Sequence, residues 1–170
     1  PNKPAEFPIL FREPKWSEDT EIKSRGATIE KQNGFIRVSK IWKKGDQIDI
    51  LFKAEIEINR SLKEEVYLSR GPLVYSLGYD AKFTEIKSYP VNGFYDMEAT
   101  IQKGQLENYL FSKDSGFVFT KKGDLPKNPW EDSNLILQGN FYNKQNKSHE
   151  RIDLVPLGTV LLRQTSFKTK

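Results

Sequence analysis

Adjacent carboxylates are the first residues in this sequence with types suited to acid–base chemistry. The sequence contains three such pairs: Glu18-Asp19, Glu64-Glu65 and Glu131-Asp132. Hydrolysis by two carboxyl groups, as in glycosidases, needs them about 5–10 Å apart across a cleft, and one must have a raised pKa. Neighbours on a strand point to opposite faces, so adjacency does not supply that geometry. We interpret the pairs as solvated surface charge, and we assign no catalytic residue.

Nucleophilic and metal chemistry has few residues to use in this chain. The 170 residues include no Cys and a single His, His149. The lack of Cys excludes a thiol nucleophile, a disulfide, an iron–sulfur cluster and a thiolate zinc site. The single His excludes a multi-histidine metal site. His149 lies in the polar segment 143–150 with no recognisable nucleophile beside it, so we expect an exposed loop histidine, no metal and no cofactor.

Aromatic side chains are the remaining candidates for ligand contacts. An exposed loop Trp indicates binding, because it leaves a large apolar area in water. Trp130 lies among polar neighbours in 127–132, and we favour a lid packed on the edge of a sandwich over a binding role for it. Trp42 ends a patterned strand, and we expect it in the core. The candidates for a carbohydrate-stacking platform are Trp130, Trp16, Tyr89 and Tyr95.

Size and charge narrow the class of protein. A chain of 170 residues forms one domain or two very small ones and needs no staple to fold. Its 27 basic and 23 acidic side chains are interspersed, so we expect no nucleic-acid partner despite a net charge of +4. No apolar run approaches the length of a membrane span. The chain opens Pro1-Asn2-Lys3-Pro4 without Met, and we expect it to be a piece of something longer.

Alternating hydrophobicity predicts strands in the first 60 residues. Even positions of 47–58 are apolar from Ile48 to Ile58, which predicts one long half-buried strand, or two joined by a bulge. The run 35–42 alternates as well, and 43–46 is a polar loop of the kind that connects hairpins. Asn33-Gly34 indicates a tight turn after a short strand at 28–31. We therefore expect an antiparallel meander.

The rest of the chain predicts further strands around a polar insertion. Expected strands are 73–79, 135–142, a run at Ile152 and Leu154, and a final strand at 159–167. We expect 81–133 to be loop-rich and aromatic-containing, with 121–133 irregular and at most one short helix at 105–111. Short strands separated by turn signals predict an all-β, antiparallel β-sandwich, jelly-roll or Ig-like. We treat 1–170 as a single domain.

Three motifs in order resemble landmarks of a known family. The hairpin Ile41–Ile50 has the pattern W-x-x-G-D-x-[apolar]-x-[apolar], and Val66–Leu77 contains R-G-P-L-V-Y. Leu154–Gly158, followed by Leu161-Leu162-Arg163 and Phe167, is similar to a closing strand. Together they resemble the C-terminal β-sandwich region of β-L-arabinofuranosidase-like proteins, glycoside hydrolase family 127. The resemblance spans 9–80 and 150–167 and leaves 81–149 unassigned.

The resemblance implies a protein of two parts. Family members have a catalytic α/α barrel, whose proposed machinery is a Cys nucleophile near zinc with glutamates, and this chain has no Cys to match it. We therefore expect a non-catalytic accessory domain that packs on the barrel of the same polypeptide and shapes the substrate cleft, in a periplasmic or extracellular bacterial protein. The alternative is a carbohydrate-binding module for an oligo- or polysaccharide. A free-standing glycosidase is a third interpretation, without a recognisable acid/base pair.

Overall fold

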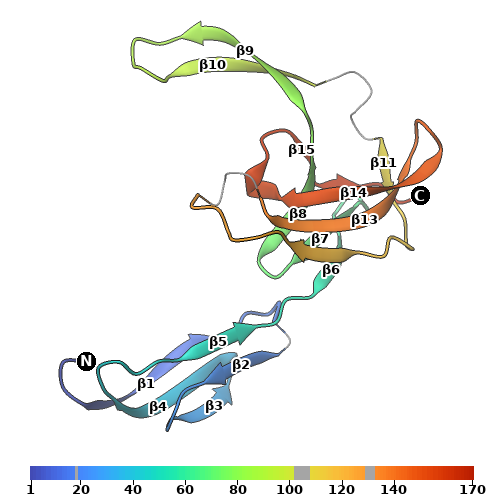
Figure 1. Ribbon diagram of the computed structural model, residues 1–170. Coiled ribbons are helices and arrows are strands. Elements are labelled where there is room, and N and C mark those ends of the chain that lie inside the picture. Colours follow the sequence, from blue (N-terminus) through green and yellow to red (C-terminus); the bar gives the residue numbers. More distant parts are fainter. Residues whose placement is uncertain (18, 102–107, 129–132) are drawn as a thin grey trace. The chain divides into compact units, whose positions relative to one another are not determined.

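The computed structural model describes residues 1–17, 19–101, 108–128 and 133–170 (Figure 1). The chain clusters into two compact units, Pro1–Glu55 (unit 1) and Ile56–Lys170 (unit 2). Within the described residues all named strands pair antiparallel, and the helical element is one 3-10 turn, η1 (Leu157–Thr159). The predicted all-β, antiparallel, sandwich-like class is confirmed. The prediction of one domain over 1–170 concerns independent folding and stays a prediction.

Unit 1 consists of two small antiparallel sheets. Along β4 (Phe35–Trp42), alternate residues are buried, which is why this run has a period of two in the sequence. The Trp42 indole donates a hydrogen bond of 2.8 Å to the carbonyl of Phe7, and its ring is buried as predicted. One sheet has the order β1 (Ala5–Arg12), β4, β3 (Thr28–Gln32), and the other pairs β2 (Thr20–Lys23) with β5 (Asp49–Phe52).

Two glycine turns fix the ends of β4. Asn33 and Gly34 both have positive φ, 51° and 76°, as a type I′ turn requires, and they connect β3 to β4 in the predicted hairpin. The turn 43–46 closes with a 2.7 Å bond from the Lys43 amide to the Asp46 carboxylate. This turn does not form the predicted hairpin, because β4 pairs with β1 and β3 while β5 pairs with β2.

Neither form of the prediction for 47–58, one long strand or two joined by a bulge, is correct. The segment divides into β5 and β6 (Ile56–Arg60), and β6 pairs with β7 (Val66–Arg70) in unit 2. The break at 53–55 keeps the parity of the apolar residues. Alternation indicates which residues share a face of a sheet, but it does not indicate which strand pairs with them. The alternating pattern therefore continues across residues 53–55 and does not predict the break between the two strands.

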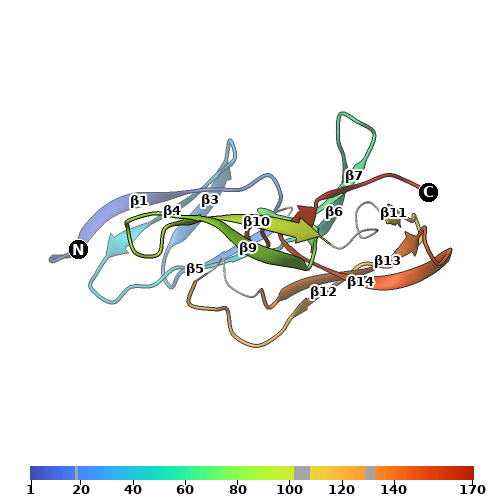
Figure 2. The same ribbon diagram turned by 90° about the horizontal axis from the view of Figure 1, so that it is seen from above.

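Unit 2 is built on one large antiparallel sheet system. Its core contains Tyr75, Phe141, Leu154 and Phe167, all with 0% exposed side chains. The strands pair in the order β11 (Tyr109–Phe111), β13 (Leu135–Asn143), β14 (Ser148–Pro156), β8 (Leu73–Gly78), β7 and β16 (Ser166–Phe167). Three further strands pair with members of this series: β12 (Val118–Lys121) with β13, β15 (Arg163–Gln164) with β8, and β6 with β7. Figure 2 shows β12, β13 and β14 running side by side.

The R-G-P-L-V-Y motif forms the tight β7–β8 hairpin. Arg70 and Leu73 face each other in the register, with Gly71-Pro72 as the two-residue loop. Gly71 has a φ of 57°, and Pro at the next position has its φ fixed near −65°, a combination that suits a type II′ turn. The turn places Tyr75 in the core.

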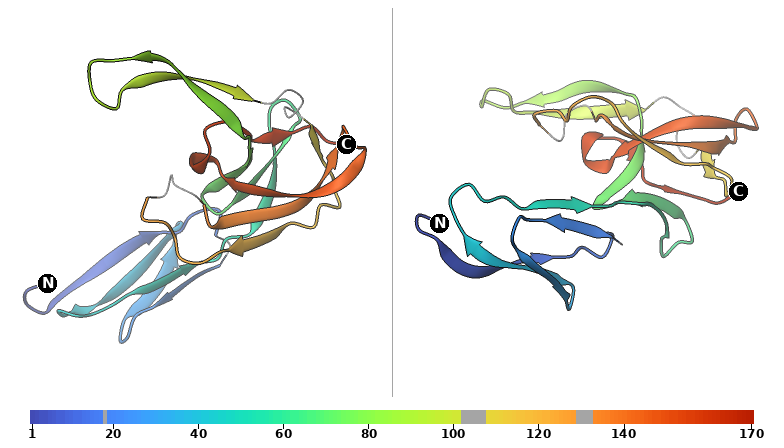
Figure 3. Two further views of the ribbon diagram at one scale, coloured as in Figure 1. Left: turned by 45° about the horizontal axis from the view of Figure 1, so that its top comes forward. Right: turned by 60° about the horizontal axis from the view of Figure 1, so that its bottom comes forward.

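The expectation of a loop-rich 81–133 is wrong for much of that segment. Residues Ala81–Ser88 (β9) and Tyr95–Ile101 (β10) form a two-stranded hairpin, drawn in green in Figure 3. β11 and β12 are strands as well, so the predicted short helix at 105–111 is wrong for Tyr109–Phe111, and its first residues, 105–107, lie outside the described residues. The hairpin residues are mostly exposed, and the alternation along β10 is short and lies in a polar part of the sequence. The described part of 121–133 is irregular beyond β12, as predicted.

The closing segment is more broken than expected. In place of one strand at 159–167, it contains η1, β15 and β16. β15 pairs with β8 and β16 pairs with β7, so the chain changes neighbour after two residues. In the described parts of the chain, no helix is both long enough and apolar enough to cross a membrane.

Candidate binding cleft

Two neighbouring hollows on unit 2, of about 280 and 240 Å³, share Tyr79 and Tyr109 in their walls. We call them together the tyrosine cleft. Tyr79 follows β8 directly, and Tyr109 begins β11. The first hollow is also lined by Glu65, Arg163, Gln164 and Ser166, and the second by Asp80, Asn108, Asn143 and Gln145. The walls are thus rich in hydroxyl, amide and charged groups.

Strand pairing brings the Tyr79 side of the cleft together. Because β15 pairs with β8, Gln164 lies opposite Leu77, within reach of Tyr79. The Tyr79 hydroxyl donates to Oε1 of Gln164 at 2.7 Å, and Nε2 of Gln164 donates to the Ser166 carbonyl at 3.0 Å. The Ser166 hydroxyl is in turn hydrogen-bonded to the carboxylate of Glu65. These bonds hold the amide plane of Gln164 in one orientation.

The Tyr109 side of the cleft is organised by Glu150. Its carboxylate accepts bonds from the Tyr109 hydroxyl at 2.9 Å and from Nδ2 of Asn143 at 3.0 Å, and it is also bonded to Asn146. Hydrogen bonds lower the pKa of Glu150, and the one from Asn143 has the largest effect, followed by those from Asn146 and Tyr109. Burial, followed by the bond to Glu150, raises the pKa of Tyr109. Both shifts favour an ionised carboxylate and a neutral phenol.

This electrostatic arrangement suits binding better than acid catalysis. A glycosidase general acid needs a raised pKa, and the shift of Glu150 has the opposite sign. Arg163 donates to the carbonyls of Val160 at 2.7 Å and Leu161 at 3.1 Å, so its guanidinium is oriented by the backbone. A cleft of fixed amides, phenols and charges presents the groups that recognise polyhydroxylated ligands.

The proposed stacking residues are divided between the two units, and one of them lies outside the described residues. Tyr89 and Tyr95 lie near each other at the end of the β9–β10 hairpin, where Ser88 pairs with Tyr95, and both are exposed. Trp16 belongs to unit 1, is half-buried, and meets Phe52 edge to face at a centroid distance of 5.7 Å. Trp130 lies outside the described residues. His149 is exposed as predicted, although it lies in β14 rather than a loop.

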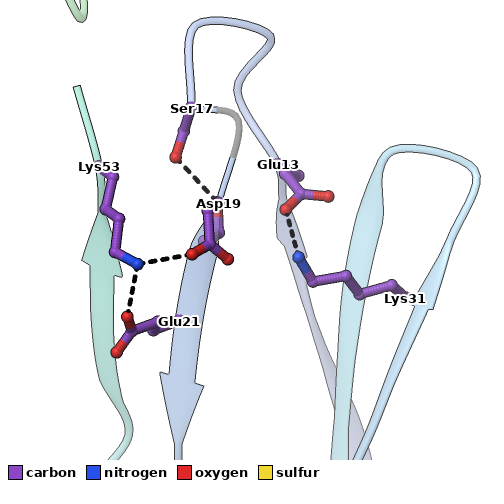
Figure 4. Close-up of polar contacts among 7 residues, drawn as sticks. Glu13, Ser17, Asp19, Glu21, Lys31 and Lys53 are labelled. Carbon is purple, nitrogen blue, oxygen red and sulfur yellow. Dashed lines mark hydrogen bonds and ion pairs between the residues drawn. The ribbon is translucent and has the colours of Figure 1, made fainter. Parts of the chain in front are cut away.

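Asp19 and Glu64 behave as surface charge, whereas Glu65 lines the tyrosine cleft and is hydrogen-bonded to Ser166. Asp19 and Glu21 both contact the Lys53 amino group, at 2.5 and 2.8 Å, and Glu13 contacts Lys31 at 2.8 Å (Figure 4). Hydrogen bonds to Lys53 lower the pKa of both Asp19 and Glu21, and they raise that of Lys53. The Lys53 ion pairs join the residue after β5 to Glu21 in β2 and to Asp19 just before it, and the Glu13–Lys31 pair joins the residue after β1 to β3. Glu18 and the pair 131–132 lie outside the described residues.

Sequence reasoning missed the residues of the tyrosine cleft. Tyr79 and Tyr109 are 30 positions apart in the sequence, and Gln164 comes much later. One signal was available: Tyr79 follows the R-G-P-L-V-Y strand directly, and Gln164 follows the Leu161-Leu162-Arg163 landmark. Pairing these two landmark strands would have placed Tyr79 beside Gln164.

Comparison with known proteins finds a family model that matches the first third of the chain. Residues 1–54 match the family model described as β-L-arabinofuranosidase, GH127 middle domain, and this match covers almost all of unit 1. No curated protein matches the sequence. The predicted C-terminal position within a longer protein stays a prediction.

Two solved structures share the fold. One is titled glycoside hydrolase, with a TM-score of 0.62 and 19% identity over 98% of this chain and 28% of its own. The other is a GH127 β-L-arabinofuranosidase from Geobacillus stearothermophilus T6, with a TM-score of 0.57 and 17% identity over 95% of this chain and 25% of its own. The chain therefore spans about a quarter of the length of the proteins it resembles. The first 54 residues are thus similar in sequence to the GH127 middle domain, and nearly the whole chain is similar in fold to two solved glycoside hydrolases.

Proposed function

We propose that this chain is a non-catalytic β-sandwich accessory region of a glycoside-hydrolase-like protein. In this proposal it packs on the α/α-barrel catalytic domain of the same polypeptide and shapes the rim of the substrate cleft. One observation carries the proposal: the fold of 98% of this chain corresponds to only 28% of a solved glycoside hydrolase. The name of the matching model, a middle domain, also fits a segment with neighbours in its own chain.

The chemistry of the described carboxylates supports the same function. Glu150 is held ionised by three hydrogen-bond donors, and Glu65 is bonded to Ser166. The lowered pKa of Glu150 is the opposite of what a glycosidase needs in the carboxyl that protonates a leaving group. Catalysis is therefore assigned to the remainder of the longer polypeptide, whose proposed substrate class, by its relation to GH127, is a β-L-arabinofuranoside.

Hydrolysis assays separate this proposal from a free-standing enzyme. The 170-residue chain is expected to release no phenol from an aryl β-L-arabinofuranoside, whereas the longer gene product is expected to do so. The carboxylate variants Glu65→Gln and Glu150→Gln serve as matched controls in both proteins. Turnover by the 170-residue chain that either variant abolishes would place the active site here and overturn the accessory role.

Carbohydrate binding at the tyrosine cleft is a second candidate function. The observation in its favour is the fixed Gln164 amide between the Tyr79 hydroxyl and the Ser166 carbonyl, which leaves a polar, oriented wall. On a glycan array, the chain is expected to bind an oligosaccharide, and Tyr79→Phe should weaken that binding roughly 5- to 10-fold, the effect of about one hydrogen bond. Tyr95→Ala, at the exposed hairpin, should leave it unchanged. The reverse ranking would favour the hairpin as a stacking platform, and no sugar-dependent signal would remove binding altogether.

A further inference from the structure

The β9–β10 hairpin has one apolar face and one polar face. Residues directly opposite each other in an antiparallel pair lie on the same face. The register places Ala81, Phe83 and Glu85 opposite Ile101, Ala99 and Met97, and Tyr95 shares their face by alternation along β10. The other face holds the pairs Lys82–Thr100, Thr84–Glu98 and Lys87–Asp96. The register shifts between Asp96 and Met97, so Ile86 has no partner in the pairing and is 64% exposed at this irregularity. The hairpin is therefore an amphipathic ribbon, which we call the amphipathic hairpin.

The apolar face of the amphipathic hairpin is open to solvent. Phe83, Met97 and Tyr95 are 44%, 43% and 51% exposed. Among the described strands, β9 and β10 pair only with each other. A two-stranded hairpin alone is marginally stable in water, and its apolar face is stabilised when another element covers it.

The polar face of the hairpin needs no partner. Lys87 and Asp96 face each other with opposite charge, and the Tyr89 hydroxyl donates to Asp96 at 2.9 Å. The Lys87 amino group also lies 4.5 Å from the centre of the Tyr89 ring, a cation–π contact. These groups are solvated and paired, so the asymmetry between the two faces points to one covered side.

The area of the apolar face limits the kind of partner that can cover it. Seven strand residues at about 3.3 Å each, two strands wide at about 4.8 Å per strand, give a face of roughly 23 by 10 Å. That is about 230 Å², well below the roughly 800 Å² per partner that a stable complex between separate proteins buries. A contact this small is sufficient only when the partner is tethered, because a linker supplies a high effective concentration.

We infer that the apolar face of the amphipathic hairpin docks on another domain of the same polypeptide. The inference rests on the proposed function, because the chain spans 28% and 25% of the two solved structures and so leaves most of such a protein to supply the partner surface. Glu85, opposite Met97 on this face, carries a negative charge into the contact. The matching surface is apolar and presents a basic side chain or hydrogen-bond donor to Glu85.

Hydrogen exchange tests this docking in the longer gene product. The amides of β9 and β10 are expected to exchange at least about tenfold more slowly there than in the 170-residue chain, because docking suppresses local opening. The variant Phe83→Ser/Met97→Ser should remove that difference, whereas Lys82→Ser/Glu98→Ser, on the opposite face, should retain it. Each variant is also measured in the 170-residue chain, so that loss of the hairpin itself is separated from loss of docking.

Three outcomes would overturn the docking. The first is equal exchange of the β9 and β10 amides in the longer product and in the 170-residue chain, and the second is an equal loss of protection in both double variants. The third is concentration-dependent dimerisation of the 170-residue chain that Phe83→Ser/Met97→Ser abolishes. That result would assign the apolar face to a second copy of the chain. Glycoside hydrolysis by the longer product is scored separately. An active product with an unprotected hairpin defeats the docking alone, and a protected hairpin in a product inactive on glycosides defeats the proposed function alone.

Discussion

Phe141→Ala is expected to lower the free energy of unfolding of the chain by about 3–5 kcal/mol, the range for truncating a buried phenylalanine. Phe141 is fully buried in β13, where its ring lies 4.7 Å from that of Phe167 and 5.9 Å from that of Phe117. It also meets Phe111 edge to face at 6.4 Å. Its removal leaves a cavity that three other rings line, and rings held by strand pairing cannot collapse into it fully. Equilibrium urea unfolding followed by circular dichroism measures the change.

The matched control for this prediction is a phenylalanine that unit 2 leaves in water. Phe94 is 66% exposed at the turn of the amphipathic hairpin, so Phe94→Ala in the 170-residue chain should change stability by no more than about 0.5 kcal/mol. Phe141→Leu, which keeps most of the buried volume, should fall between the two. Similar small losses for Phe141→Ala and Phe94→Ala would show that the ring cluster is not the core of this unit.

The strands that the sequence predicts are those with one buried face. Phe35–Trp42 alternates because β4 buries Ile36, Val38 and Trp42 and exposes the residues between them. β1 escaped prediction because its apolar residues occupy both parities and Pro8 interrupts it. Pro lacks the N–H that a central strand must donate, and β1 is an edge strand of its sheet, where that loss is tolerated.

Strand neighbours are the part of the fold that a single sequence leaves open. β5 and β6 belong to one continuous alternating run yet lie in different units. The alternation could not predict this separation, because it does not specify which strand pairs with each of them. The same reason hid the tyrosine cleft, whose walls are brought together by pairings between distant segments, among them β15–β8 and β11–β13. The amphipathic hairpin is different: Tyr95–Ile101 alternates apolar and polar residues, so its period-two pattern was present and was obscured by its polar surroundings.

Gly139→Ala is the second substitution with a large expected effect, a loss of about 1–3 kcal/mol from overpacking. Gly139 lies in the middle of β13, and a Cβ built there would overlap Cε1 and Cδ1 of Phe117 and lie 3.3 Å from its Cζ. The Phe117 ring is not free to move away, because it stacks on Phe111 at 6.0 Å and meets Phe141 at 5.9 Å. The ring thus covers the strand at the one position without a side chain. Urea unfolding measures the loss.

Two other glycines provide a graded control for the overlap at Gly139. A Cβ at Gly78 would lie 3.0 Å from Cγ1 of Val160, and one at Gly158 would meet nothing within 4 Å. Stability should therefore fall most for Gly139→Ala, less for Gly78→Ala and least for Gly158→Ala. If the Phe117 ring is the cause, Gly139→Ala should cost less in a Phe117→Leu background, with a coupling energy of at least about 0.5 kcal/mol. Additive losses in that double-mutant cycle would mean that the β13 backbone, rather than the ring above it, sets the requirement for glycine.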